Sequence, residues 1–244
     1  MIRFVICTTS LLICYFIYGF YISQYEINII RRTFDRRSSA SEFYDYRGII
    51  NVHSDISIGS SSPAKIAEAA KNAGIDFLIL TDLNAFEDSI HNDSYSQGVL
   101  FLNGAKYSYL DSRLIFYSPN KELAGKNLGE TQIRFADMLT QGEGGNKNSL
   151  LLLAHPFHLG FSWSGDFPTG FDGIELINLK ALSVQAWQRS KASVAWSSLI
   201  YPFNPSFALA RLFVEPSDEL AFFDKVSQNQ HLLAYAGAEA SARA

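Results

Sequence analysis

The sequence predicts an α/β domain with a largely parallel sheet, preceded by one membrane-spanning helix. Short apolar runs of the length of buried strands alternate with segments in which apolar residues recur at helical spacing. A separate and almost continuous apolar stretch opens the chain. Alternating strands and helices favour a parallel sheet, which either closes as a barrel or stays open in a doubly wound fold.

The composition is that of a chain with a proper hydrophobic core, because 48% of the 244 residues are hydrophobic and 18% are charged. The net charge of -4 argues against nucleic acid as a partner, since binding to phosphate backbones needs a basic surface. Cys7 and Cys14 both lie in the first apolar stretch. The rest of the chain therefore has neither a disulfide framework nor a cysteine-based zinc site.

Residues 1–23 are predicted to form a membrane anchor. The apolar stretch from Phe4 to Ile22 is long enough, as a helix, to cross a hydrocarbon core of about 30 Å. Its tyrosines gather in the second half, as is typical near lipid headgroups. A cleavable signal peptide is the alternative, but its apolar region is usually only about 7–15 residues long and ends at small residues. The stretch fits an uncleaved anchor better.

The arginines indicate which side of the membrane the domain occupies. Only Arg3 precedes the span, whereas the arginines of residues 31–37 follow it. The positive-inside rule then favours a single-pass protein whose large domain lies in the cytoplasm. Residues 24–46 are polar and are predicted to be a juxtamembrane connector, and residues 47–244 are predicted to form the folded domain.

Seven strands and four helices are predicted within the domain. Ser62 and Pro63 suit the N-cap and first position of a helix, and Gly74 stands where a helix-terminating glycine belongs. The glycines of residues 142–148 lack the flanking strand and helix of a phosphate-binding loop. A barrel usually has a helix that covers its last strand, but only five residues follow the last predicted strand in this sequence. We therefore expect that the natural chain is longer. The predicted strands are 48–54, 75–82, 99–110, 112–118, 149–156, 173–178 and 231–239, and the predicted helices are 63–73, 130–141, 179–195 and 217–228.

Six polar or charged residues each lie at or near the C-terminal end of an apolar strand. Those ends converge on one rim in α/β sheets and barrels, and sites are built there. Each residue alone has an ordinary explanation, such as a structural histidine or an aspartate that caps a helix. Six of them at successive strand ends predict a site. They are His53, Asp82, Lys106, His155, Glu175 and Glu239.

Residues 47–84, RGIINVHSDISIGSSSPAKIAEAAKNAGIDFLILTDLN, resemble the opening of the PHP (polymerase and histidinol phosphatase) superfamily. Members read His-x-His-Ser, a Ser-Asp-Gly-like turn, a helix and then Thr-Asp-His-Asn. Later segments are similar to further PHP motifs: NGAKYS to Gly-x-Glu, LLAHPF to the His-Pro motif, and AGAEAS to the closing Gly-x-Asp-x-His. The resemblance implies a distorted seven-stranded (β/α) barrel related to the TIM barrel. It also implies two or three divalent metals that activate water against a phosphate ester.

Several ligand positions of that motif set are altered in this chain. Leucine cannot bind a metal, and a lysine ammonium adds positive charge where metals would sit. A complete two-metal phosphoesterase site is therefore not expected. Asn51 stands in place of the first His of the opening motif, and Ile58-Gly59-Ser60 stands in place of the Asp-containing turn. Leu83 replaces the His that follows Thr-Asp, and Lys106 replaces the bridging Glu. At the closing motif, Glu239 replaces the Asp and Ser241 replaces the His.

Three hypotheses follow. The favoured one is a domain that binds or scaffolds without hydrolysis: Lys106 stands where a metal stood and pairs with Asp82 or Glu239, leaving a pocket for a small anionic or phosphorylated ligand. The second is an active metal-dependent phosphoric ester hydrolase, in which His53 and His155 hold one manganese, zinc or iron ion and Asp82 or Glu239 completes the site. The third is a tethered structural domain without a ligand.

The remaining polar candidates complete the prediction. Asp82 and Lys106 are the candidate catalytic residues, and Asn51 and Glu175 are further rim residues that can contribute to the site. His91, His158 and His231 are predicted to lie outside it, because none of them ends an apolar strand.

Overall fold

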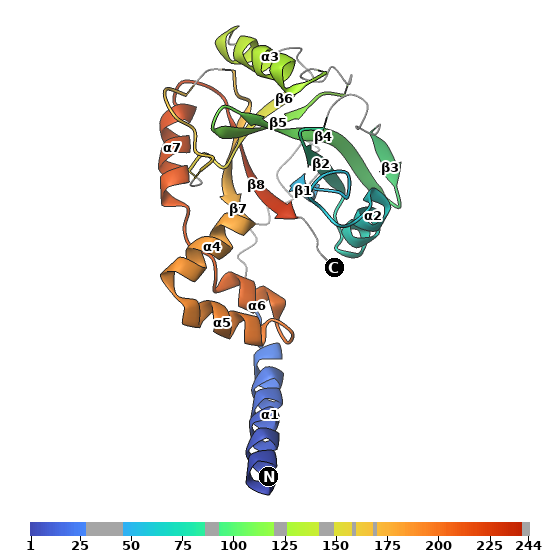
Figure 1. The fold of residues 1–244 in the computed structure, drawn as a ribbon, viewed down its shortest axis with the longest axis vertical. Helices are drawn as coiled ribbons and strands as arrows, with labels where there is room; N and C mark the ends of the chain where they lie inside the picture. The colour runs from blue at the N-terminus through green and yellow to red at the C-terminus, as the bar shows by residue number, and fades with distance from the viewer. Residues whose placement is uncertain are drawn as a thin grey trace, which may run out of the picture. The chain divides into compact units, whose positions relative to one another are not determined.

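The computed structural model describes residues 1–27, 46–85, 93–119, 126–141, 149–157, 160–167 and 170–240 (Figure 1). The contacts divide the chain into two compact units. One contains Met1–Phe43 and Leu182–Glu215, and the other contains Tyr44–Ala181 and Pro216–Ala244. Predictions that lie outside the described residues concern His91, His158, Ser241, the loop 142–148 and most of the connector 24–46.

Seven strands of the second unit form a closed barrel. The hydrogen-bonded order is β2-β1-β8-β7-β6-β5-β4, and a further pairing of β2 with β4 closes the circle. The predicted seven-stranded α/β barrel is confirmed. The strands are β1 (Gly48–Val52), β2 (Phe77–Leu83), β4 (Val99–Tyr109), β5 (Ser112–Tyr117), β6 (Leu150–Ala154), β7 (Gly173–Asn178) and β8 (Leu233–Ala240).

The barrel is mixed but largely parallel. β5 runs antiparallel to both β4 and β6, while the other neighbouring pairs of the barrel are parallel. The tight turn at Leu110 and Asp111 causes the reversal between β4 and β5, as predicted from the two short apolar runs. A short strand that was not predicted, β3 (Ser94–Ser96), adds to the start of β4 outside the closed circle.

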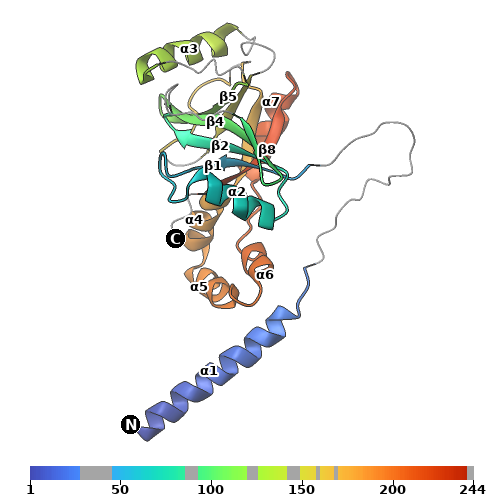
Figure 2. The same cartoon turned by 90° about the vertical axis from the view of Figure 1, so that its right-hand side faces the viewer.

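Three helices of this unit lie outside the barrel: α2 (Pro63–Asn72), α3 (Leu128–Gln141) and α7 (Ser217–Ser227) (Figures 1 and 2). α2 begins as predicted, with Ser62 as N-cap and Pro63 at the first position, although no side-chain bond caps it. Gly74 follows the helix with φ +69°, a conformation that favours glycine.

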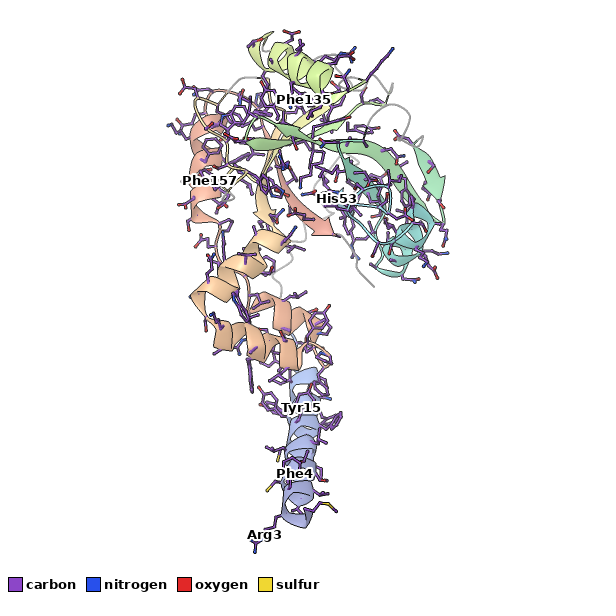
Figure 3. All side chains as sticks on the ribbon, in the orientation of Figure 1. Arg3, Phe4, Tyr15, His53, Phe135 and Phe157 are labelled. Carbon is purple, nitrogen blue, oxygen red and sulfur yellow. The ribbon has the colours of Figure 1, made fainter. Side chains whose placement is uncertain are left out.

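Each face of the sheet has its own apolar layer. Ala67 of α2 packs in one cluster with Leu78 and Leu80 of β2. On α3, the fully buried Phe135 meets the ring of Tyr107 at a centroid distance of 5.4 Å (Figure 3). The interior of the barrel holds a third cluster, drawn from β1, β5, β6 and β8. Most of the strands are thus covered on both faces, which explains their nearly continuous apolar runs, whereas β8 is largely exposed or half-buried.

The first unit is helical. It contains α1 (Ile2–Ser23), α5 (Lys191–Ile200), α6 (Pro205–Ala210) and most of α4 (Leu179–Arg189). The predicted single helix over 179–195 is wrong. α4 ends at Arg189, and Ser190 starts α5 by accepting a hydrogen bond from the Ser193 backbone at 3.2 Å. α6 was not predicted.

Candidate functional site

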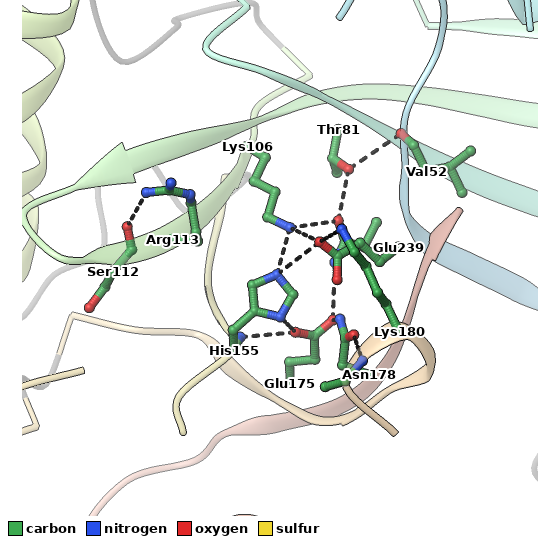
Figure 4. A network of polar contacts seen from close by, with 12 residues as sticks. Val52, Thr81, Lys106, Ser112, Arg113, His155, Glu175, Asn178, Lys180 and Glu239 are labelled. Atoms are coloured by element: carbon green, nitrogen blue, oxygen red, sulfur yellow. Dashed lines mark hydrogen bonds and ion pairs between the residues drawn. The ribbon is translucent and has the colours of Figure 1, made fainter. Parts of the chain in front are cut away.

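Lys106 of β4 lies at the centre of a buried polar network (Figure 4). Its ammonium donates to Nε2 of His155 at 2.7 Å and to Oδ1 of Asn51 at 3.2 Å. It also lies 3.5 Å from Oε1 of Glu239. Burial lowers the pKa of Lys106, and the nearby charges of Glu239 and Glu175 oppose that change. The ammonium is therefore held by groups from three separate segments of the chain.

Glu175 of β7 orients the second layer of this network. Its Oε1 accepts from the amides of Asn51 and Asn178, each at 3.1 Å. Its Oε2 accepts from the backbone N–H of His155 and lies next to Nδ1 of the same residue, both at 2.9 Å. Burial alone would raise the pKa of Glu175, but the hydrogen bonding of His155 and Asn178 and the charge of Lys106 hold that pKa below its ordinary value.

His155 lies between a cation and an anion. Nε2 faces the ammonium of Lys106, which can only donate, so Nε2 must accept. Nδ1 faces the carboxylate of Glu175, which accepts, so Nδ1 must carry the hydrogen. The network thus assigns the neutral tautomer with the proton on Nδ1.

Three network residues have left-handed backbone conformations: Asn51 (φ 67°), His155 (φ 56°) and Glu239 (φ 44°). Such a conformation costs about 1–3 kcal/mol in a residue other than glycine, with asparagine among the least affected. At Asn51 the register of β1 shifts against both β2 and β8. A bulge of this kind re-aims the side chains around it. The backbone therefore stores strain to bring these groups together.

Glu239 joins the buried network to the surface. Its Oε1 lies 3.6 Å from Nε2 of His155 and 3.6 Å from Nζ of Lys180, in addition to its contact with Lys106. The side chain of Lys180 is 58% exposed, whereas that of Glu239 is 12% exposed. Burial raises the pKa of Glu239, but the positive charges of Lys106 and Lys180 outweigh that effect and lower it.

Asp82 holds the loop that follows β1. Its Oδ1 accepts from the backbone N–H of Ser54 at 2.8 Å and from Oγ of Ser57 at 2.6 Å. Its Oδ2 accepts from Oγ of Ser54 at 2.7 Å. Of the two partners predicted for Lys106, the structure has Glu239 in contact with the ammonium. The catalytic role of Asp82 stays a prediction, and the structure adds a positioning role.

His53 is the unusual member of the site. It is 2% exposed, and neither ring nitrogen has a hydrogen-bond partner within the described part of the chain. Burial, followed by the charge of Lys106, lowers the pKa of His53 to about 4. The ring is therefore neutral at pH 7. Figure 3 places it among the barrel strands.

The side chains do not fit the metal centre that the resemblance implies. The Lys106 ammonium lies among His155, Asn51 and Glu239, and a cation there repels a metal ion. Across the described ranges, no group of three or more histidine, cysteine, aspartate or glutamate side chains could hold a metal ion. The one-metal alternative on His53, His155 and Glu239 would require the ammonium to leave Nε2 of His155. We therefore derive no chemical step through a metal.

Gly237 of β8 makes room for the carboxylate of Glu175. A Cβ at this position would lie 1.7 Å from Oε1 and 2.9 Å from Cδ of Glu175. Any other residue would push Glu175 away from its partners. The glycine of the AGAEAS segment therefore has a packing function.

Five of the seven predicted site residues are joined directly by these contacts, and His53 and Asp82 lie beside them. Asn178 was missed although it ends β7, the same positional signal that identified the others. Ser54 was visible in the His-Ser motif, but its bond to Asp82 depends on the folded loop. The connected residues are Asn51, Lys106, His155, Glu175 and Glu239.

No protein-family model matches the sequence, and no curated protein matches it. Among solved structures, PsfC from Pseudomonas syringae is similar with a TM-score of 0.50 and 13% sequence identity. The match covers 81% of this chain and 78% of PsfC. At this identity, the similarity shows a shared fold alone.

Two further solved structures are more distant. One, from Bifidobacterium adolescentis, is assigned as a metal-dependent phosphoesterase (TM-score 0.43, 12% identity, 80% of this chain and 88% of that one). The other is a two-domain protein from Bacteroides vulgatus that contains a predicted PHP-like metal-dependent phosphoesterase (TM-score 0.38, 16% identity, 59% of this chain and 48% of that one). TM-scores of this size carry no argument about the function of this chain.

Proposed function

We propose that this chain is a degenerate, membrane-tethered member of the PHP superfamily whose barrel acts as a scaffold and does not hydrolyse phosphate esters. The sequence motifs and the closed seven-stranded barrel support the family assignment. The altered ligand positions support the loss of hydrolysis.

The contacts of Lys106 carry the proposal. Its ammonium contacts Asn51, His155 and Glu239, which are three positions that the resemblance assigns to metal ligands. A covalently attached cation now balances the carboxylates that a metal would otherwise balance. The barrel keeps its polar interior without an exchangeable ion.

The same contacts favour a scaffold over an anion-binding site. Lys106 is 3% exposed, and Glu239 already neutralises its charge. A phosphorylated ligand would have to displace Glu239 in order to reach the ammonium. Lys180 is the accessible cation beside Glu239, so a small anion would meet Lys180 first.

The tether is α1. It contains the one segment in the described chain, Arg3–Ser23, that is long and apolar enough to cross a membrane. Its 22 residues extend over about 33 Å as a helix, which matches a hydrocarbon core. The arginines that follow it support a cytoplasmic position for the barrel.

The test is metal content and turnover measured on one sample of the full chain in detergent. We expect substoichiometric manganese, zinc and iron by elemental analysis. Hydrolysis of p-nitrophenyl phosphate should not exceed that of the His155→Ala variant. A chelator should leave the unfolding temperature unchanged.

Near-stoichiometric metal, with turnover abolished both by the chelator and by His155→Ala, would instead establish the one-metal hydrolase. The Lys106→Glu variant restores the bridging carboxylate and serves as a positive comparison for metal uptake. Isothermal titration with inorganic phosphate separates the two non-hydrolytic versions. Binding that is lost in Lys106→Met but kept in Lys180→Met would favour an anion-binding site over a scaffold.

A further inference from the structure

In the first unit, the second half of α1 packs against α5, α6 and the turn between them. Oη of Tyr15 donates to the carbonyl oxygen of Leu199 at 2.8 Å. The ring of Tyr18 lies 5.2 Å from Trp196, and the ring of Tyr25 lies 4.8 Å from Phe207, measured between centroids. The residues that contact α1 thus include aromatic side chains on both helices.

Two details fix this contact. The amide of Asn204 donates to the carbonyl oxygens of Ile22 at 3.0 Å and Tyr25 at 2.7 Å, which ties the end of α1 and the residues after it to the start of α6. A Cβ on Gly19 would lie 2.4 Å from the ring of Phe203, so the glycine lets the ring approach the helix backbone. Ile22 is 6% exposed, whereas most of the apolar residues before it in α1 are exposed.

The same segment also leaves several large apolar side chains partly exposed, although Trp196 contacts Tyr18 and the ammonium of Lys191 lies over the ring of Trp187. Between residues 182 and 214 the chain has the basic residues Arg189, Lys191 and Arg211 and no aspartate or glutamate. The exposed large side chains of this segment are each 38–51% exposed. They are Val184, Trp187, Trp196, Leu199, Tyr201, Leu209 and Phe213.

We propose that residues 182–214 form a second membrane-contacting element, which lies at the boundary between lipid headgroups and acyl chains, beside the C-terminal end of α1. This inference rests on α1 being the membrane anchor, as proposed above. Tryptophan and tyrosine concentrate at that depth, because each ring has an apolar body and a polar atom. Short helices with exposed apolar side chains and basic residues bind the boundary between headgroups and acyl chains.

The location and the charge of these side chains both favour lipid. The exposed surface joins, through Trp196 and Leu199, the part of α1 that carries Tyr15 and Tyr18. A segment with three basic residues and no acidic residue complements anionic lipid headgroups. The membrane that holds α1 is therefore the occupant that both the location and the charge of this surface favour.

The test uses depth-dependent quenching of tryptophan fluorescence in the full chain, reconstituted into vesicles that contain phosphatidylserine. Two single-tryptophan chains are compared. One keeps Trp196, and the other keeps Trp163, which packs against Phe171 in the barrel unit. Bromine atoms sit on the acyl chains either near the headgroup or near the bilayer centre. We expect Trp196 to lose most of its fluorescence when the bromine atoms are near the headgroup and less when they are near the bilayer centre. Trp163 should lose no fluorescence with either lipid.

The controls separate this inference from the anchor. If the chain resists alkaline extraction but Trp196 is not quenched, α1 is a membrane anchor and the interfacial element is refuted. The apolar side chains of residues 182–214 would then be covered by a second copy of the chain or by another protein. If alkaline extraction releases the chain, the anchor itself fails. Photoactivatable phospholipid on the unaltered chain gives a second measurement. Labelled peptides from 182–214 support the inference, and labelling confined to residues 1–27 overturns it.

Discussion

The ammonium of Lys106 lies 2.7 Å from Nε2 of His155, so a side chain of the protein contacts the nitrogen that a metal ion would need. His155 receives this contact because Glu175 holds its other nitrogen. The site is a closed set of complementary charges, and each member depends on the others.

Replacing Lys106 by methionine should destabilise the protein by about 3 kcal/mol, because the change leaves buried carboxylates without their cation. Denaturant unfolding of the full chain in detergent, followed by circular dichroism, measures the loss. Lys180→Met is the matched control: that lysine is 58% exposed, and its removal should cost under about 1 kcal/mol. Equal losses in the two variants would contradict the buried network.

Stability should fall as the pH drops from about 7 to about 5, by roughly 2 kcal/mol from His53 alone. The sign follows from its folded-state pKa of about 4, below the ordinary value of 6.5. As the pH falls between these values, the unfolded chain binds a proton that the folded chain excludes. His53→Leu should remove this contribution, whereas His231→Leu, which alters an exposed histidine, should keep it.

A separate loss should appear at lower pH. Glu175 and Glu239 have folded-state pKa values below their ordinary value of 4.5. Their contribution is complete above that value and disappears as the pH falls through the lowered folded-state values. A Glu239→Gln variant should therefore lose less stability in this acidic window than the parent chain, and an unchanged acid limb would refute the assignment.

Gly237→Ala should destabilise the barrel by about 3 kcal/mol or more, because the new methyl group would overlap the fixed carboxylate of Glu175. Gly129→Ala is the control. It lies in the first turn of α3 with no side-chain clash below 3.3 Å, so alanine should leave stability unchanged or raise it slightly. Thermal unfolding of both variants gives the comparison.

Asp82→Asn tests the positioning role of Asp82. The amide cannot accept at its nitrogen, so part of the bonding to Ser54 and Ser57 is lost, at a cost of about 1–3 kcal/mol. Limited proteolysis should then cut the loop after β1 faster than in the parent chain. A variant with unchanged loop protection but lost phosphatase turnover would instead assign Asp82 a catalytic role.

Strands such as β2 and β6 were predictable because they are buried on both faces and therefore read as short apolar runs. β3 was missed for the converse reason: its three residues, Ser94–Ser96, contain no apolar run. The break between α4 and α5 was missed although the polar residues 188–191 interrupt the apolar spacing and Ser190 was a usable N-cap signal. For α6, Asn204 followed by Pro205 was a usable start signal, since asparagine caps helices and proline suits their first position.

The site was predictable in membership but not in connection. Strand ends identified Lys106, His155 and Glu175, because position along a strand is a local property. The contacts among them depend on the closure of the barrel and on the bulge at Asn51. The local spacing of apolar residues predicts neither feature. The choice of Glu239 over Asp82 as the partner of Lys106 is a consequence of that geometry.

The bond between Tyr15 and Leu199 joins positions 184 residues apart. A ribosome adds about 5–20 residues per second, so α1 is made roughly 10–40 s before its packing partner emerges. Pairing within the barrel is delayed in the same way, because β1 is synthesised long before its partner β8. Until then the edge of β1 is unpaired and open to wrong partners. Early membrane insertion of α1 would keep each nascent chain apart from soluble neighbours during that delay.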